Sequence, residues 1–263
     1  MAQTDAAAPY PGRPFAERAA QVAATAPFAW LAAGARDFRA AFGTSLGYGM
    51  VFVLAGIVLT VALLAANMVY LFVPLATGFM LIGPAATLGL YAISRDLEAG
   101  RQPSLGNALQ SFRANPGPML YVGAALLGVF MVWLRMAQLT YALAFQDTIG
   151  LDAHSLLYAT LFTGEGRAFL AITMVMGGVM AALVFAGTAF ALPMLLDRPV
   201  GMAEAVATSW TAVGANLPAM AVWAVLLVAL TVLGMAVGLV GLAVTLPLAG
   251  HATWHAYRAV IRQ

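Results

Sequence analysis

Long uncharged stretches of hydrophobic residues dominate the chain, and most charged residues lie in the segments between them. Residues 40–94 and 205–257 contain no Asp, Glu, Lys or Arg over 55 and 53 residues. A helix that crosses a bilayer needs about 20 residues, so each stretch accommodates two crossing helices joined by a tight turn. Residues 168–196 and 118–143 each accommodate one more, the latter interrupted only by Arg135. The pattern predicts an all-α, polytopic membrane helix bundle with six transmembrane helices.

The expected limits of these helices follow from the ends of the uncharged stretches and from turn residues such as Asn67 and Pro74. We expect crossing helices at residues 46–66, 75–94, 118–143, 168–196, 217–237 and 241–258, with an outer loop at residues 145–167.

Three shorter segments show apolar residues at helical spacing between polar ones, the pattern of a helix lying on a membrane surface. They are residues 27–42, 103–114 and 201–214, and Asp37 is expected on a polar face of the first. Residues 1–25 are rich in Ala and Pro and predict a disordered tail. The membrane domain is therefore expected over residues 26–263.

The second and third surface segments each lead into an Asn and a helix-opening Pro, which indicates an internal repeat. The repeated unit is an inward-going helix, a surface helix and an outward-going helix, and its copies run parallel. Parallel repeats occur in some transporters, but duplication also builds purely structural bundles. The Asn and Pro residues are Asn115 with Pro116 and Asn216 with Pro218, and the inward-going helices contain Pro84, Pro193 and Pro247.

Composition narrows the possible chemistry. Hydrophobic residues make up 63% and charged residues 8% of the chain, whereas soluble domains are roughly one-quarter charged. We therefore expect the protein to lie in a lipid bilayer, and we expect no nucleic-acid partner. Every basic residue is Arg, and the absence of Lys excludes P-loop and pyridoxal chemistry. The absence of Cys excludes thiolate metal sites, iron–sulfur clusters and Cys nucleophiles.

The distribution of arginine predicts the orientation, because cytoplasmic loops collect positive charge. Ten of the twelve arginines fall in the N-terminal segment, the two inner loops and the C-terminal tail. We therefore expect a multi-pass protein of the bacterial inner membrane with both termini in the cytoplasm.

His251 and His255 are the first candidates for a metal site, because a spacing of four residues places both imidazoles on one helix face. A metal would need further ligands, and one haem cannot take both side chains as opposite axial ligands. The alternative is a helix end at the level of the lipid head groups, where histidines and aromatic residues are common. No resident cofactor is expected, and metal or haem binding through this pair stays an alternative.

Arg135 is the one charge well inside a predicted span, which makes it a functional candidate. Counted from Pro118 at about 1.5 Å per residue, it lies near 26 Å from the inner surface, close to the outer edge of the hydrocarbon. It either extends outward toward Asp147 or lines a pathway through the bundle.

Two glycine patterns fit known motifs, one of hydrolases and one of close helix packing. Gly43, Ser45 and Gly47 fit the G-x-S-x-G motif of hydrolases, but no strand leads into them, so we expect no nucleophile. Gly234 and Gly238 fit G-x-x-x-G, which lets helices approach closely.

Three segments resemble an uncharacterised bacterial family of integral membrane proteins, a domain of unknown function with some members labelled as cytochrome c oxidase components. The likeness covers roughly residues 27–262 and implies one whole-length membrane domain, and the label implies association with a respiratory complex. The segments are residues 89–100, with Arg95 and Glu98; residues 192–198, with Pro193, Asp197 and Arg198; and residues 250–258, with Gly250, Trp254, Tyr257 and Arg258.

The hypothesis that follows is a non-enzymatic accessory protein that binds another membrane complex, for example a respiratory oxidase. The alternatives are a small transporter or channel built on the parallel repeat, and metal or haem handling through His251 and His255.

Overall fold

The computed structural model describes residues 19–145 and 153–262 and shows a helical bundle. Five helices in this part of the chain are long and apolar enough to cross a membrane. They are α2 (Phe42–Ala65), α3 with α4 (Phe72–Ala86 and Leu88–Glu98), α6 (Pro116–Ala144), α8 with α9 (Gly164–Thr188 and Ala191–Asp197) and α11 (Leu217–Ala236). The predicted all-α membrane bundle is confirmed.

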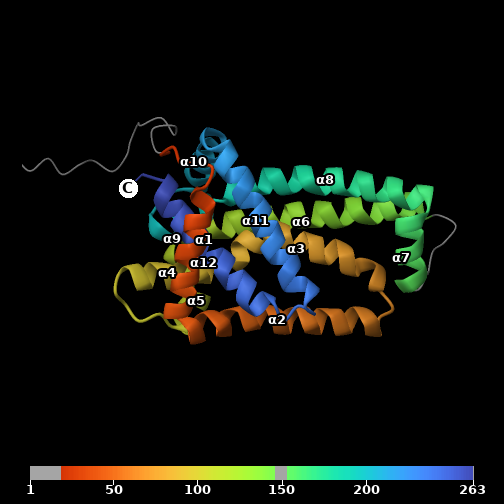
Figure 1. The fold of residues 1–263 in the computed structure, drawn as a ribbon, viewed down its shortest axis with the longest axis horizontal. Helices are drawn as coiled ribbons and strands as arrows, with labels where there is room; N and C mark the ends of the chain where they lie inside the picture. The colour runs from red at the N-terminus through yellow and green to blue at the C-terminus, as the bar shows by residue number, and fades with distance from the viewer. Residues whose placement is uncertain (1–18, 146–152, 263) are drawn as a thin grey trace, which may run out of the picture.

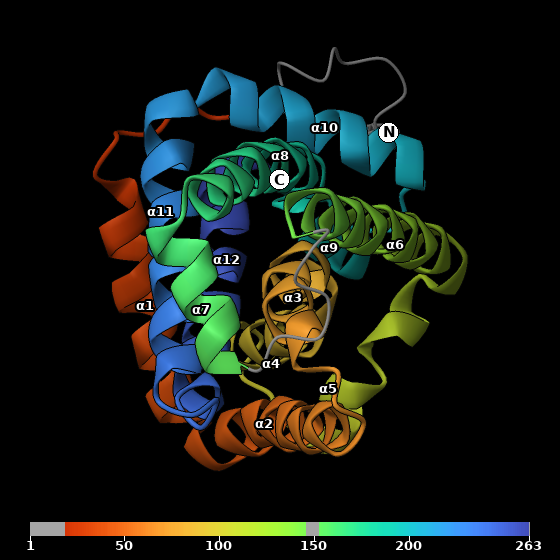
Figure 2. The same cartoon turned by 90° about the vertical axis from the view of Figure 1, so that its right-hand side faces the viewer.

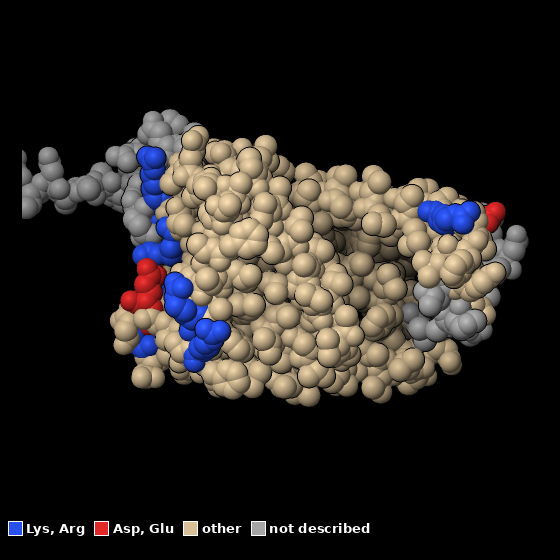
Figure 3. All heavy atoms as spheres, viewed as in Figure 1, with Lys and Arg blue, Asp and Glu red and all other residues tan. Residues whose placement is uncertain are grey.

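The shorter helices lie across the two ends of this bundle (Figures 1 and 2). At one end α1 (Ala26–Ala40) and α10 (Met202–Ala215) cross it, and at the other end α7 (Ala153–Phe162) does. Charged residues gather at these two ends, most of them beside α1 (Figure 3). We call the first the Arg-rich end and the second the α7 end.

The predicted surface segments are helical, with shifted limits. The first is α1, the second is split into α5 (Leu105–Leu109) and the 3-10 turn η3 (Ser111–Ala114), and the third is α10. Their position on a membrane surface stays a prediction. The outer loop expected at 145–167 contains α7 and the start of α8, and residues 146–152 of it lie outside the described residues.

The sixth predicted crossing helix, residues 241–258, is α12 (Leu242–Val260), and it is not among the five helices that meet the requirements for a span. Figure 1 shows the α11–α12 hairpin ending part-way along the bundle, before the ends of α6 and α8. The side chain of Leu239 in its turn comes within 3.1 Å of the position that a Cβ on Gly56 would take, near the middle of α2. The helices of the last hairpin therefore have close to the predicted lengths, 20 residues in α11 and 19 in α12, but their turn lies part-way along the bundle (Figure 1).

Two predicted single helices are broken at corresponding places. The α3–α4 helix breaks at Thr87, after Pro84, and the α8–α9 helix breaks at residues 189–190, before Pro193. A proline inside a helix lacks the amide hydrogen and collides with the preceding turn, which accounts for the break before Pro193. At the second break the hydroxyl of Ser209 donates to the Ala186 carbonyl at 2.8 Å and accepts from the Phe190 amide at 3.1 Å, so α10 satisfies the freed backbone groups.

The repeat has a third unit, split between the two ends of the chain. η3 packs on α4, and α10 packs on α9, and in the same way α1 packs on α12. The chain ends meet there, because the Ala20 amide donates to the Val260 carbonyl at 2.7 Å and Ala19 pairs with Ile261. The disordered tail expected over residues 1–25 therefore does not extend through residues 19–25. The three short helices α1, η3 and α10 also share a sequence pattern. It occurs at residues 37–40 (Asp-Phe-Arg-Ala), 111–114 (Ser-Phe-Arg-Ala) and 209–212 (Ser-Trp-Thr-Ala).

Candidate functional site

A fully buried histidine joins three helices at the Arg-rich end. His251, on α12, has no exposed surface. Its Nε2 atom lies 2.9 Å from the hydroxyl of Ser45 on α2, and its Nδ1 atom lies 2.8 Å from the hydroxyl of Ser94 on α4. Both ring nitrogens of His251 are therefore engaged.

The hydrogen bonds continue to His255. The Ser94 hydroxyl donates to Oδ2 of Asp37 on α1 at 2.7 Å, and Nε2 of His255 lies 2.8 Å from the same oxygen. Ser45, His251, Ser94, Asp37 and His255 thus form one chain of contacts, here called the histidine network. It runs from a completely buried serine to a histidine side chain that is 31% exposed.

The geometry fixes where the protons lie. An ionised carboxylate only accepts hydrogen bonds, so Ser94 and His255 both donate to Asp37. Since Ser94 has one proton to give, its oxygen accepts from the Nδ1–H of His251. A neutral imidazole then accepts at its other nitrogen, and Ser45 donates to it.

The carboxylate of Asp37 is held in its charged form. Burial by itself would raise its pKa, but the hydrogen bonds from His255 and Ser94, with smaller electrostatic contributions from His255 and His251, outweigh burial and lower the pKa below the usual 3.8. Asp37 was expected on a polar face of a surface helix, and the structure instead turns it inward.

Small residues bring the helices close enough for these contacts. A Cβ on Gly34 of α1 would lie 2.5 Å from the Ala252 backbone nitrogen, and one on Gly250 of α12 would lie 2.6 Å from the Leu90 side chain. Side chains at these positions would push α1 and α4 away from α12. Gly250, singled out in the sequence, is therefore a packing residue.

The other motif residues connect the C-terminal half of α12 to the helices next to it. Glu98 accepts from Nε1 of Trp254 at 3.1 Å and from Nε of Arg258 at 3.0 Å. The hydroxyl of Tyr257 donates to Asp197 at 2.7 Å. These contacts attach α12 to α4 and α9.

Two arginines complete this set. Arg198 lies 3.6 Å from the Asp197 carboxylate, and Arg95 donates to the Leu196 carbonyl at 2.6 Å. The three segments that resembled a known family therefore meet at one place, together with Pro193 at the start of α9.

The buried part of the network is closed to a substrate, and its two histidines are not part of a larger group of metal ligands among the described residues. Ser45 and His251 form a Ser–His pair, but both have zero exposure, so no substrate reaches the hydroxyl. Among the described residues no group of three or more His, Asp or Glu side chains is arranged to hold a metal. The ring nitrogens of His251 are already bonded to serines, and Nε2 of His255 to Asp37.

Arg135 lies apart from this network. It is exposed on α6 and makes no hydrogen bond or ion pair within residues 19–145 and 153–262. Its expected partner, Asp147, lies outside the described residues. The two glycines of the second G-x-x-x-G pattern also separate, since Gly234 packs against α12 and Gly238 lies beyond the end of α11 with φ 64°.

Sequence reasoning found His251 and His255 but not Asp37, Ser45 or Ser94 as their partners. The available signal was the repeat, because Asp37 stands where the other two units have Ser111 and Ser209. An acidic residue at that position predicts a cationic or hydrogen-bond-donating neighbour on the helix that comes before it in the repeat unit. For the unit split between the chain ends, that helix is α12.

Helices of spanning length, with charges gathered at the two ends, define a polytopic integral membrane protein. Residues 71–197, just under half of the chain, match the family described as "Predicted integral membrane protein (DUF2189)", which confirms for this part of the chain the likeness to an uncharacterised family of integral membrane proteins. The oxidase label is not part of this match, and residues 250–258 lie outside it. No curated protein and no solved structure matches the chain.

Proposed function

We propose that this protein is a non-enzymatic accessory protein that binds a transmembrane helix of another protein along the exposed face of α6. The observation that carries the proposal is Arg135, an exposed arginine on a spanning helix without a partner among the described residues. A charged side chain within a membrane span is unfavourable unless it is paired or reaches water.

The face that contains Arg135 is suited to close helix contact. Ala124, Gly128 and Arg135 are spaced by four and seven residues and share one side of α6. A Cβ on Gly128 would meet nothing within 4 Å, so this side is open. Small residues four apart let two membrane helices approach closely. The same face exposes Leu120, Met131 and Leu139.

The charge specifies the partner. Arg135 follows Pro116, the first residue of α6, by 19 residues, about 28 Å along the helix. A carboxylate on the partner helix at that depth would pair with it, and buried polar pairs of this kind fix helix register.

The location belongs to the same proposal. The Arg-rich end is the cytoplasmic side by the positive-inside rule, which places both termini in the cytoplasm of a bacterium, with the chain in the inner membrane. The oxidase label attached to some members of the family that the sequence resembles makes a respiratory complex the first partner to test.

The experiment compares two substitutions of the same kind. Gly128→Leu blocks the proposed face, whereas Gly178→Leu places an equal side chain in open space on α8. Purification of tagged protein in mild detergent should recover a stoichiometric membrane protein with the natural chain and with Gly178→Leu, and at least tenfold less with Gly128→Leu or Arg135→Glu. Reversal of the partner's acidic residue to Arg should restore recovery with Arg135→Glu. Equal recovery with all variants, or no stoichiometric partner, would contradict the proposal.

A small transporter is the second candidate, supported by the breaks at corresponding places in α3–α4 and α8–α9. Flux into proteoliposomes that exceeds flux into empty vesicles and is abolished by Pro84→Ala with Pro193→Ala would favour it over the accessory role.

A further inference from the structure

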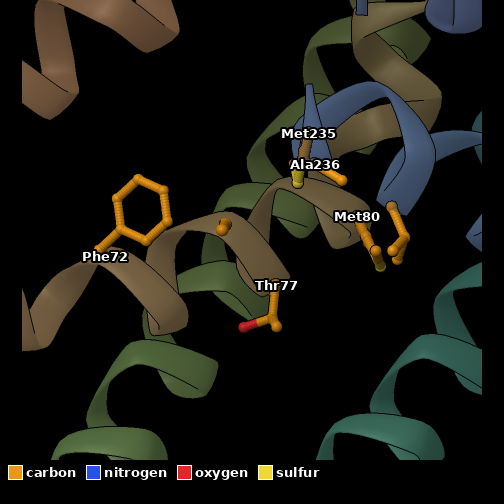
Figure 4. Close-up of a pocket in the computed structure, with 7 residues that line it drawn as sticks. Phe72, Thr77, Met80, Met235 and Ala236 are labelled. Atoms are coloured by element: carbon orange, nitrogen blue, oxygen red, sulfur yellow. The ribbon is translucent and has the colours of Figure 1, made fainter. Parts of the chain in front are cut away.

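An apolar hollow lies between α3 and α11, beside the α11–α12 hairpin. Its volume is about 320 Å³, at the lower end of the range for small-molecule pockets, roughly 300 to 1,000 Å³. Figure 4 shows the side chains around it, and Figure 3 shows the surface hollowed in the half of the molecule nearer the α7 end. The lining residues are Phe72, Ala76, Thr77, Met80, Val232, Met235 and Ala236.

The hollow exists because the α11–α12 hairpin turns back early. The turn at Gly238 and Leu239 has left-handed backbone conformations, with φ 64° and 69°, and Leu239 contacts the middle of α2. Beyond this turn α3, α6 and α8 continue toward the α7 end without the hairpin beside them (Figures 1 and 2).

Aromatic residues indicate how deep the hollow lies. Tyr70 stacks on Tyr141 with ring centroids 6.0 Å apart, and Tyr141 contacts Phe169 edge-on at 6.3 Å. Tyrosines gather at the level of lipid head groups. The α3 lining residues, from Phe72 to Met80, follow Tyr70 by 2 to 10 residues, about 3 to 15 Å deeper at the rise of a helix. The hollow therefore lies in the hydrocarbon layer.

Water finds at most one acceptor in this space, the hydroxyl oxygen of Thr77, whereas a buried water needs about two to four polar partners. Thr77 is the one lining side chain with a hydrogen-bonding group, and its hydroxyl bonds the carbonyls of Val73 at 2.8 Å and Pro74 at 3.2 Å in its own helix. Cavities lined by apolar groups stay dry and take up apolar ligands.

We propose that the hollow is a binding site for a phospholipid of the leaflet at the α7 end, with one acyl chain between α3 and α11. Arg167, exposed in the first turn of α8, binds its phosphate. Basic side chains at the membrane surface bind lipid head groups, and Figure 3 shows basic atoms at that end, beside the hollow. This site is separate from the exposed face of α6.

Native mass spectrometry of protein reconstituted with a single phospholipid, phosphatidylglycerol, tests the site. The natural protein should retain one lipid per chain after detergent exchange. Ala76→Phe fills the hollow and should lower retention at least fivefold, whereas Ala55→Phe, the same change at an exposed position of α2, should leave it unchanged. Arg167→Gln should lower retention by an intermediate factor.

A second variant separates loss of the site from loss of the fold. Ala236→Phe fills the hollow from α11, so it should repeat the effect of Ala76→Phe with an unchanged melting temperature. Cross-linking with a phospholipid that has a diazirine in its acyl chain should label Met80 or Met235 in the natural protein. Equal retention in Ala76→Phe, Ala236→Phe and Ala55→Phe, or labelling that avoids the hollow, would overturn the proposal.

Discussion

The two halves of the bundle differ in how their helices are held together. At the Arg-rich end, α12 is enclosed by α1, α2, α4 and α11, and residues such as Trp223, Trp254, Tyr257 and His251 are almost completely buried. Toward the α7 end α6 still touches α8 and the turn before α3 through aromatic side chains, but little protein covers these helices, and only 6% of the most apolar part of the Gly164–Asp197 span is buried. In lipid, apolar faces need no protein cover, whereas polar groups do. Close packing is therefore concentrated where the histidine network lies.

The largest expected effect comes from removing the centre of that network. His251→Leu leaves the Ser45 hydroxyl buried without its imidazole partner and leaves Ser94 with Asp37 alone. An unsatisfied buried group costs about 1 to 3 kcal/mol and a lost hydrogen bond about 1 kcal/mol. We expect a loss of about 2 to 5 kcal/mol, measured by thermal unfolding in detergent. Thr60→Val is the control, because that hydroxyl bonds only the Gly56 carbonyl of its own helix. Equal melting temperatures for the two variants would show that the network does not stabilise this half.

The next effect tests close packing without changing a polar group. Gly34→Ala places a methyl group against the backbone of Ala252, and overpacking of this kind costs about 1 to 3 kcal/mol. Gly178→Ala, with open space around its Cβ, should be neutral or stabilising by up to about 1 kcal/mol, because Ala favours helices. Stability changes of opposite sign for these two Gly→Ala substitutions would confirm the difference in packing between the two regions. Changes of the same sign would contradict it.

The third effect depends on pH and is confined to the Arg-rich end. A carboxylate whose folded pKa is lowered contributes stability above its unfolded pKa, and that stability is lost as pH falls through the folded pKa. Asp37, whose pKa is lowered from 3.8, should therefore stabilise the protein at pH 5 to 7. Asp37→Asn should lower stability by about 1 to 2 kcal/mol in that range, and the gap should shrink below about pH 4. Chemical unfolding at several pH values measures it, and a gap that widened toward acid would contradict the assignment.

The sequence predicted the spans well because hydrocarbon imposes a length and a composition on each of them. It did not predict how the last hairpin sits, since residues 205–257 are uncharged whether or not the turn reaches the far surface. It singled out His251 and His255 by spacing, but not Asp37 or Ser94, whose proximity depends on the chain ends meeting at Ala19 and Ile261. Long-range closure of this kind has no local signal, and the third repeat unit was hidden because it is split between the termini.

The smallest expected difference between the two regions concerns one kind of backbone strain that occurs in both. Gly100 follows α4 at the Arg-rich end with φ 67°, and Gly238 follows α11 in the hairpin turn with φ 64°, and a Cβ on either would meet nothing within 4 Å. Each Gly→Ala change should cost about 1 to 2 kcal/mol, because a left-handed conformation is unfavourable for a residue with a Cβ. Thermal unfolding of both variants should give equal losses, since the strain is local and independent of the surrounding packing. A much larger loss for Gly238→Ala would show that the hairpin turn tolerates no adjustment, which would place part of the molecule's rigidity in the half that the packing leaves open.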